Sequence, residues 1–503
     1  MKSVLAIDQG TTGTTALVFN DDGKLRGRAY REIRQFYPAS GWVEHDPEEL
    51  YRSVIETGGE ALRLGRCEGS VAAIGITNQR ETFVIWERAS GRPIGRAIVW
   101  QCRRSAEICN AMRSREPDIA RRTGLVLDPY FSATKLKWWL DRNPAARRRA
   151  IRGELCFGTV DSWIVFRLTR GSEFITDVTN ASRTMLLNLD RRTWDPAMLR
   201  MMDVPPAMLP RVVSSRGPVA EAAPGTIAAR PIPIGAIIGD QQAALFGQGA
   251  VRAGAAKVTY GTGAFLLAHT GSQLVHSRRR LLSTIALDAE GAPACALEGS
   301  VFVAGAAIQW LRDGLKIIET AAESEALARR GGTRGSLYMI PAFVGLGAPY
   351  WDSAARGALL GLTRDTNRAD IAAAALDAIA YQITDVISAM EDDMGRRLTD
   401  LRVDGGASVN DYLMQTQADL SGRTIRRPVF AEATAQGAAM LAGLALGVWK
   451  SPEVLDSMRK IGRIFRPSIS SVARKRLVDG WREAVARILT VKPATRRIRS
   501  RRV

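Results

Sequence analysis

The sequence predicts an α/β fold in which two related domains face one cleft. An apolar, strand-like run, a glycine- and threonine-rich turn and a second strand-like run occupy residues 4–20, and the same order recurs at 257–268. A further strand-like run leads into a glycine turn at 401–407. The chain has 503 residues, which exceeds one ordinary hydrophobic core. A recurring strand–turn unit in each half therefore indicates two domains of one architecture.

The first half opens with three predicted antiparallel strands. Residues 4–7 and 16–20 flank the turn at 10–15, and Asp22-Gly23 is a hairpin signal before the alternating run 24–33. Later segments predict a buried strand at 71–77, a hairpin-like pair at 83–86 and 94–100, and helices at 47–63, 103–112 and 134–140.

The second half contains a long helical pattern at 371–394. Its apolar residues fall at 371, 375, 376, 379, 383, 386, 387 and 390, as expected for one buried helix face. Residues 248–254 offer hinge-like glycines between the halves. We therefore expect an N-terminal domain at 1–250, a C-terminal domain at 251–491 and a basic tail at 492–503.

Composition favours a cytoplasmic globular enzyme over other classes. The net charge is +19, from 70 Lys+Arg against 51 Asp+Glu, but the basic residues are dispersed, so we expect a solvated surface and no nucleic-acid partner. Five cysteines form no CxxC pair, which favours reduced thiols. No apolar run approaches the ~20 residues of a membrane span, and Asp8 interrupts the N-terminal apolar stretch, which argues against a signal peptide.

The turn at 10–15 has the chemistry of a phosphate cradle. Its glycines leave backbone N–H groups unhindered, and its four threonines add hydroxyl donors. It lacks the lysine of a Walker A loop. Alone it reads more often as a plain hairpin, but the turns at 261–263 and 403–406 make three glycine turns after strands. Together they predict a nucleotide site.

Two acids stand where strand-like runs end. Asp8 lies beside the first phosphate turn, which favours a Mg²⁺ role exercised mainly through water. Asp240 precedes an alanine-rich helical stretch and reads either as a helix N-cap or as a general base. The only histidines, His45, His269 and His276, lie away from the glycine turns, so a carboxylate is the better base. A phosphate cradle plus a distant acid predicts phosphoryl transfer.

The polar run at 78–82 is the best candidate for an acceptor site. Glu81 can accept and Arg80 can donate several hydrogen bonds to adjacent hydroxyls, although a solvated hairpin loop explains the run equally well. Trp100, Tyr130 and Phe265 read most often as core aromatics, and residue patterns alone do not select among them.

With these residues assembled, the chain resembles the glycerol kinases of the carbohydrate-kinase family nearly from end to end. That family's fold, an actin-like (ribonuclease H-like) pair of domains flanking a nucleotide cleft, is shared with actin, hexokinase and the heat-shock chaperone ATPase. The resemblance rests on residues 41–47, 77–82, 98–103, 128–135, 177–184, 239–248, 259–264, 305–312, 348–361 and 402–407.

The resemblance implies ATP-dependent phosphorylation of glycerol to sn-glycerol 3-phosphate, with Mg²⁺ as cofactor, Asp240 as general base and Asp8 as the metal-side acid. The implied glycerol contacts are Arg80, Glu81, Trp100, Tyr130, Asp240, Gln241 and Phe265. The implied ATP contacts are Thr11, Thr12, Gly13, Thr262, Gly305, Gln309, Gly406 and Asn410. Relatives also suggest a homo-oligomer, a dimer or a tetramer.

The sequence departs from the pattern of its relatives at four places. These departures affect one phosphate contact and the expected regulation. Thr15 stands where many relatives have arginine, and Ala264 replaces a common cysteine. Residues 223–231 lack the longer glycine-rich insertion through which fructose 1,6-bisphosphate inhibits some relatives, and the histidine whose phosphorylation activates others. Residues 465–471 lack an acidic residue by which some relatives bind a regulator. We therefore expect no control by fructose 1,6-bisphosphate or by phosphohistidine. Alternative functions are a kinase for another small polyol or ketose, and a nucleotide-gated chaperone or filament protein, which needs no polyol pocket.

Overall fold

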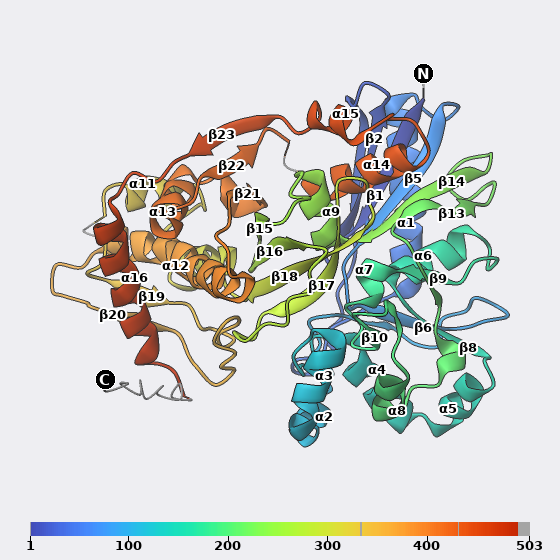
Figure 1. Ribbon diagram of the computed structural model, residues 1–503, viewed down its shortest axis with the longest axis horizontal. Helices are drawn as coiled ribbons and strands as arrows, with labels where there is room; N and C mark the ends of the chain where they lie inside the picture. The colour runs from blue at the N-terminus through green and yellow to red at the C-terminus, as the bar shows by residue number, and fades with distance from the viewer. Residues whose placement is uncertain (1, 332–333, 431, 491–503) are drawn as a thin grey trace, which may run out of the picture.

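The computed structural model describes residues 2–331, 334–430 and 432–490, and the N-terminal half is built on a six-stranded sheet (Figure 1). The strand order is β13-β14-β5-β1-β2-β3. The first three strands are antiparallel neighbours, as predicted, whereas β5 runs parallel to β1 and β14 parallel to β5. Their bounds are β1 Ser3–Gln9, β2 Gly13–Asn20, β3 Leu25–Glu32, β5 Val71–Asn78, β13 Arg216–Ala222 and β14 Ile232–Gly239.

The C-terminal half repeats this arrangement in a seven-stranded sheet ordered β17-β18-β16-β15-β21-β22-β23. The hairpin of β15 and β16 stands where β1 and β2 stand, and β21 and β22 follow in parallel as β5 and β14 do. The prediction of two related α/β domains is therefore confirmed. The bounds are β15 Ala255–Tyr260, β16 Ala264–Gly271, β17 Leu282–Leu287, β18 Pro293–Val301, β21 Asp400–Asp404, β22 Ile425–Pro428 and β23 Ile461–Phe465.

The remaining segments of the first half form a smaller lobe beside its sheet (Figure 1). Its four-stranded sheet has the order β4-β7-β6-β8, and β6 pairs antiparallel with β7 as the hairpin-like pattern predicted. The predicted strand at 94–100 is shorter in the structure, and the predicted helix at 103–112 begins later. The bounds are β4 Glu44–His45, β6 Phe83–Glu87, β7 Ala97–Ile98, β8 Leu155–Thr159, β9 Ile175–Asp177, β10 Leu187–Asn188, β11 Thr193–Trp194, β12 Arg211–Val213, α2 Ala106–Ala111, α3 Glu116–Thr123, α4 Ser132–Arg142, α5 Pro144–Ile151, α6 Val160–Leu168, α7 Val178–Ala181 and α8 Pro196–Met202.

The longest helix, α12, is a core helix of the second half. It spans Arg368–Met394 and begins with a capping box in which Asn367 and Asp370 exchange hydrogen bonds with backbone N–H groups. Among the described helices it alone has the length and apolarity to cross a bilayer, but 89% of its most apolar window is buried within the protein. The other helices and strands of this half are α10 Gly305–Gln309, α11 Glu323–Ala328, α13 Asp411–Ser421, α15 Pro452–Asp456, α16 Ser471–Ala486, β19 Tyr338–Ile340 and β20 Ala358–Leu360.

One helix from the second half of the chain packs against the sheet of the first half. α14 (Ala433–Ala445), far along the chain, packs against β5, β1 and β14 of the first sheet (Figure 1). One buried apolar cluster joins Val4, Leu17 and Ile238 of that sheet to Met440 and Leu441 of α14. α1 (Pro47–Gly65) covers the opposite face. Residues 433–458 thus complete the core of the first sheet, which the sequence pattern does not indicate.

Candidate active site

The first phosphate turn joins β1 to β2 and is closed by its own backbone. The N–H of Gly10 donates to the carbonyl of Gly13 over 2.9 Å. A Cβ at Gly13 would lie 2.6 Å from the carbonyl oxygen of Arg31, so only glycine fits at that point. Thr11 is half-buried and Thr12 is exposed, which leaves the tip of the turn open to a ligand.

Asp8, at the end of β1, is a carboxylate without a local partner. Burial raises its pKa well above the usual range, and the negative charges of Asp240 and Glu432 raise it further. No described residue donates a hydrogen bond to it. A nearby cation would relieve this repulsion, so the environment suits Mg²⁺. Within the described ranges, no three His, Cys, Asp or Glu side chains gather into a metal cage of their own.

In the C-terminal half, three glycine segments approach one another closely. Gly305, at the start of α10, donates its N–H to the carbonyl of Gly261 over 2.9 Å, and Ala306 donates to that of Thr262 over 3.0 Å. A Cβ at Gly305 would lie 2.7 Å from the Gly261 carbonyl oxygen. Gly405 has φ 85°, and a Cβ there would lie 2.4 Å from the carbonyl oxygen of Tyr260. These contacts require glycine and set the turns side by side.

The remaining candidate nucleotide residues lie around these turns. Thr262, Gln309 and Gly406 are exposed. Asn410 is half-buried, and its side chain caps α13 by accepting from the N–H of Leu413 over 2.9 Å. Thr262 follows β15 and Gly406 follows β21, so exposed residues lie at the ends of these two paired strands.

Asp240 is the first residue of α9 (Asp240–Gly247) and is not an N-cap. Gly239 holds the cap position, and the Asp240 carboxylate accepts instead from the N–H of Gln241 over 2.7 Å. It also forms an ion pair of 3.1 Å with Nε of Arg80, and its side chain keeps 27% of its surface exposed. Asp240 is thus held in place yet accessible, as a general base must be.

The run at 78–82 is buried, which excludes the solvated hairpin loop. Gln79 donates to the side-chain oxygen of Gln9 and to the Gly10 carbonyl, each over 3.1 Å, and so ties the run to the first phosphate turn. Glu81 has φ 63°, an uncommon conformation for a non-glycine residue that the surrounding structure must stabilise. Strain of this kind concentrates at functional sites.

The three candidate aromatics form one wall beside these residues. The ring of Trp100 meets Tyr130 edge-to-face at 5.5 Å and Phe265 at 6.3 Å between centroids. All three rings are half-buried rather than enclosed in a core. Nε1 of Trp100 donates to the hydroxyl of Thr11 over 2.9 Å, so the aromatic wall and the first phosphate turn are in direct contact.

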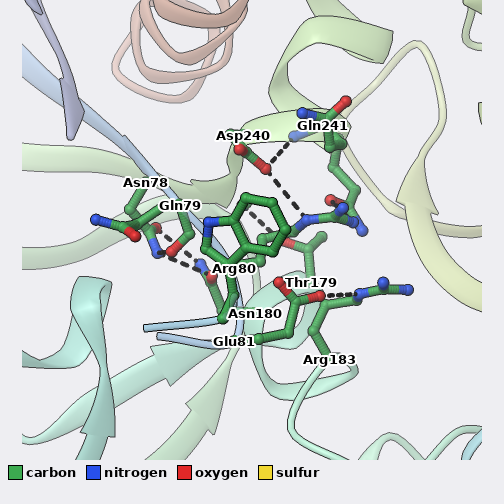
Figure 2. Close-up of polar contacts among 12 residues, drawn as sticks. Asn78, Gln79, Arg80, Glu81, Thr179, Asn180, Arg183, Asp240 and Gln241 are labelled. Atoms are coloured by element: carbon green, nitrogen blue, oxygen red, sulfur yellow. Dashed lines mark hydrogen bonds and ion pairs between the residues drawn. The ribbon is translucent and has the colours of Figure 1, made fainter. Parts of the chain in front are cut away.

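Sequence reasoning missed three buried charges at this site. Arg183 donates from Nε to Glu81 over 2.7 Å, as Figure 2 shows. Glu298 accepts hydrogen bonds from both terminal nitrogens of Arg80. Lys257 on β15 contacts the side-chain oxygen of Gln241, and burial lowers the pKa of its amine to about 8. Arg183 lies in one of the segments that carried the resemblance, but nothing local distinguished its role.

A buried network of polar side chains holds residues 78–82 and the end of β14 in place. Asn78 and Asn180 exchange side-chain hydrogen bonds of 3.0 and 3.1 Å, and Thr179 accepts the N–H of Gly239 over 2.9 Å (Figure 2). Asp177 accepts from both Thr179 and Asn180. The ends of β5 and β14 are thereby locked to α7, which sets the distance between Arg80 and Asp240.

Comparison with known proteins identifies the family of this chain. Residues 3–247 match the N-terminal domain of the FGGY family of carbohydrate kinases, and residues 256–446 match its C-terminal domain. The chain is 52% identical over 489 residues to glycerol kinase 2 of Pseudomonas aeruginosa, covering 97% of each chain. It is 50% identical over 492 residues to glycerol kinase 2 of Thermotoga maritima, covering 97% of this chain and 99% of that one.

Solved structures show the same architecture. Glycerol kinase of Plasmodium falciparum with ADP superposes with a TM-score of 0.92 at 34% identity, covering 98% of this chain and 99% of that one. Gluconate kinase of Lactobacillus acidophilus superposes with a TM-score of 0.86 at 21% identity, covering 96% and 97%, and shows the shared fold alone. With both domains matched and half of its residues identical to those of relatives over nearly the full length, this chain belongs to the FGGY family of carbohydrate kinases.

Proposed function

We propose that this chain transfers the γ-phosphoryl group of ATP to glycerol and produces sn-glycerol 3-phosphate. The observation that carries this proposal is the contact of Arg80 with Asp240 beside the aromatic wall. A partly exposed carboxylate, a buried guanidinium and an apolar surface together fit a small molecule with hydroxyls on one side and carbons on the other. Relatives at about half identity are named glycerol kinases, which supports the same substrate.

In the proposed mechanism, Asp240 accepts the proton of the attacking hydroxyl as the new O–P bond forms and the bond between the γ-phosphorus and the bridging oxygen breaks, which releases ADP. The Arg80 ion pair keeps its carboxylate oriented toward the acceptor. Arg80, Glu81 and Gln241 would hold the hydroxyls that do not react, whereas Trp100, Tyr130 and Phe265 would cover the carbons and exclude water.

ATP would bind between the halves, since each supplies a glycine turn with an exposed threonine, Thr12 in the first half and Thr262 in the second. Thr11, Thr12 and Gly13 would face the phosphates from the first half. The residues from the second half would be Thr262, Gly305, Gln309, Gly406 and Asn410. We propose Asp8 as the Mg²⁺-side acid; the metal, when bound with ATP, offsets the phosphate charge, and Asp8 would hold it mainly through water.

Three further assignments complete the proposal. We propose domains at 1–250 and 251–491; the tail at 492–503 lies outside the described residues. We also propose a homo-oligomer, a dimer or a tetramer, and a cytoplasmic enzyme of glycerol catabolism.

The test is ADP release from Mg-ATP with a panel of polyols and ketoses. The expected result is the highest kcat/KM with glycerol. A higher kcat/KM with another small polyol or ketose would replace the substrate and leave the kinase assignment intact. ATP turnover that no acceptor stimulates would instead favour a nucleotide-gated chaperone or filament protein.

A further inference from the structure

Glu298 joins the two halves of the molecule inside the acceptor site. It lies on β18 of the second sheet, opposite Leu267 of β16 and two residues from Ser300, which pairs with Phe265. Its side chain is fully buried. The carboxylate forms an ion pair with Arg80 of the first half, which lies 218 positions away in the sequence.

The carboxylate of Glu298 accepts two hydrogen bonds from Arg80 and so forms a bidentate ion pair with it. Nη1 of Arg80 donates to Oε2 over 2.7 Å and Nη2 donates to Oε1 over 3.0 Å, so both terminal nitrogens are engaged. The one nitrogen that remains, Nε, faces Asp240 at 3.1 Å. Nη1 also donates to Oε1 of Gln242 over 3.2 Å, but of the described residues only Glu298 contacts both terminal nitrogens. Glu298 is therefore the main group that orients Arg80 toward Asp240.

The same carboxylate also reaches Glu81 through a second arginine. Oε1 of Glu298 accepts from Nη2 of Arg183 over 3.0 Å, and Nε of Arg183 donates to Glu81 over 2.7 Å. The third nitrogen of Arg183, Nη1, has no hydrogen-bond partner among the described residues. Among the described residues, the hydrogen bonds of Arg183 thus go to two carboxylates, and its guanidinium also lies 5.4 Å from the ring centroid of Phe131. The loss of Glu298 would leave it one carboxylate.

The charges balance within this buried group. Arg80 and Arg183 carry two positive charges, and Glu81 and Glu298 carry two negative ones, all with side chains at most 2% exposed. Burial alone would raise the pKa of Glu298, but Arg183 and Arg80 outweigh it and hold the pKa at about 2. Without Glu298, the excess positive charge would draw Asp240 and Glu81 into tighter ion pairs.

We propose that Glu298 is a positioning residue for the acceptor site: it orients Arg80 toward Asp240 and, through Arg183, orients Glu81. This inference rests on the proposed kinase function and adds a cross-domain requirement to it. The hydroxyl-binding groups of the first half reach their working geometry only when β18 of the second half is in place. Glu298 itself touches no reacting atom in this scheme.

The test compares Glu298→Gln with a matched variant, Asp385→Asn. Asp385 is also a buried carboxylate of the second half and accepts from Tyr350 over 2.7 Å and Trp481 over 2.6 Å, but it lies outside the acceptor site. Misplacement of a binding group by about 1 Å costs about 10²-fold. We expect Glu298→Gln to lower kcat/KM for glycerol about 10²-fold and leave KM for ATP within about twofold. Asp385→Asn should lower thermal stability without changing kcat/KM.

A double-mutant cycle separates positioning from general loosening. If Glu298 acts through Arg80, the variant carrying both Arg80→Lys and Glu298→Gln has a kcat/KM within about threefold of the worse single variant. Independent, multiplying effects would overturn the proposal, as would a Glu298→Gln enzyme whose glycerol kinetics match those of Asp385→Asn. If Glu298→Gln fails to fold, Glu298→Asp keeps the charge on a shorter side chain and should show the same coupling to Arg80→Lys.

Failure of the substrate assignment stays distinguishable from failure of this proposal. Should the wild-type chain prefer another polyol, glycerol is rejected as the substrate, and the same cycle run with the preferred polyol decides the role of Glu298. Coupling between Arg80 and Glu298 with that polyol supports the positioning role, and its absence overturns it.

Discussion

At the scale of single residues, Asp240 combines two properties that the proposed base needs: it is ion-paired with Arg80, and 27% of its side-chain surface stays exposed. The exposed part leaves room for a substrate hydroxyl. The ion pair with Nε of Arg80, at 3.1 Å, holds the carboxylate in one orientation. In the proposed mechanism, proton transfer therefore depends on Asp240, and Arg80 orients its carboxylate.

Asp240→Asn should abolish most turnover while sparing nucleotide binding. The amide keeps the shape and the hydrogen bond to Gln241 but cannot accept the proton, and loss of a general base costs about 10²–10⁴ in rate. Steady-state kcat and the Kd for ATP by calorimetry are the measurements. Asp195→Asn is a suitable control, because Asp195 caps α8 by accepting from Ala197 over 2.7 Å. Near-wild-type kcat in Asp240→Asn would rule out the base.

The pocket should discriminate against acceptors that lack one hydroxyl. Buried polar groups left without a partner cost several kcal/mol, about 10⁴-fold in the best cases. Propane-1,2-diol and propane-1,3-diol should therefore be poor substrates, and hexitols should not fit behind Trp100 and Phe265. Competition assays against glycerol measure this directly. A hexitol with a kcat/KM equal to that of glycerol would contradict the assignment of Arg80 and Glu81 as the residues that bind the glycerol hydroxyls.

The sequence indicated individual site residues better than their mutual contacts. Asp240 and Arg80 stand where polar residues follow apolar strands, so a pattern could find them, whereas Trp100 is selected only through the family resemblance. Glu298 lies within a strand as one acid among apolar residues, and its partner is 218 positions away. No local signal carries a pairing of that separation, which only the approach of the two sheets creates.

At the scale of elements, the turn after β21 separates a structural glycine from a ligand-facing one. Gly405 has φ 85° and no room for a Cβ, whereas nothing lies within 4 Å of a Cβ built on Gly406. Gly405→Ala should therefore destabilise the fold by about 1–3 kcal/mol. Gly406→Ala should keep the melting temperature and raise KM for ATP, since its methyl group would enter the proposed nucleotide surface. Equal loss of stability in both variants would contradict this division.

Strands and long helices followed from the sequence because their side chains repeat at a fixed period. The runs at 4–7, 16–20 and 24–33 became β1, β2 and β3, and the apolar stripe at 371–394 became α12. The position of α14 did not follow. Small apolar residues such as Ala438 and Ala442 lie on several faces of this helix. The period of its apolar residues therefore does not indicate which sheet the helix covers.

At the scale of the whole molecule, the proposed ATP site needs both halves at once. Thr11 and Thr12 belong to the first half, and Thr262 and Gly305 belong to the second. In this proposal the halves must close to exclude water from the transferred group. We expect a smaller radius of gyration by small-angle scattering when glycerol and a non-hydrolysable ATP analogue are both present. ATP analogue alone is the control. An unchanged radius with both ligands bound would argue against a large hinge motion.

Fructose 1,6-bisphosphate should not inhibit this enzyme through the segment before β14. Residues 223–231 form a tight loop in which Gly225 donates to Ala228 over 2.7 Å, and the Arg230 side chain donates to the carbonyl of Val71. Two phosphates favour several free N–H donors and paired arginines, and this loop offers neither. Titration of the bisphosphate to millimolar levels should leave kcat/KM unchanged. Saturable inhibition would show that another surface has this role.

The packing of α14 on the first sheet also has a consequence for how the chain is made. Ribosomes release the chain from its N-terminus, and the strands of the first sheet are complete at Gly239. The helix that covers one face of that sheet ends only at Ala445. At about 5–20 residues per second, this face stays open to the cytosol for roughly 10 to 40 s. We therefore expect the nascent first half to depend on chaperones until nearly the whole chain has emerged.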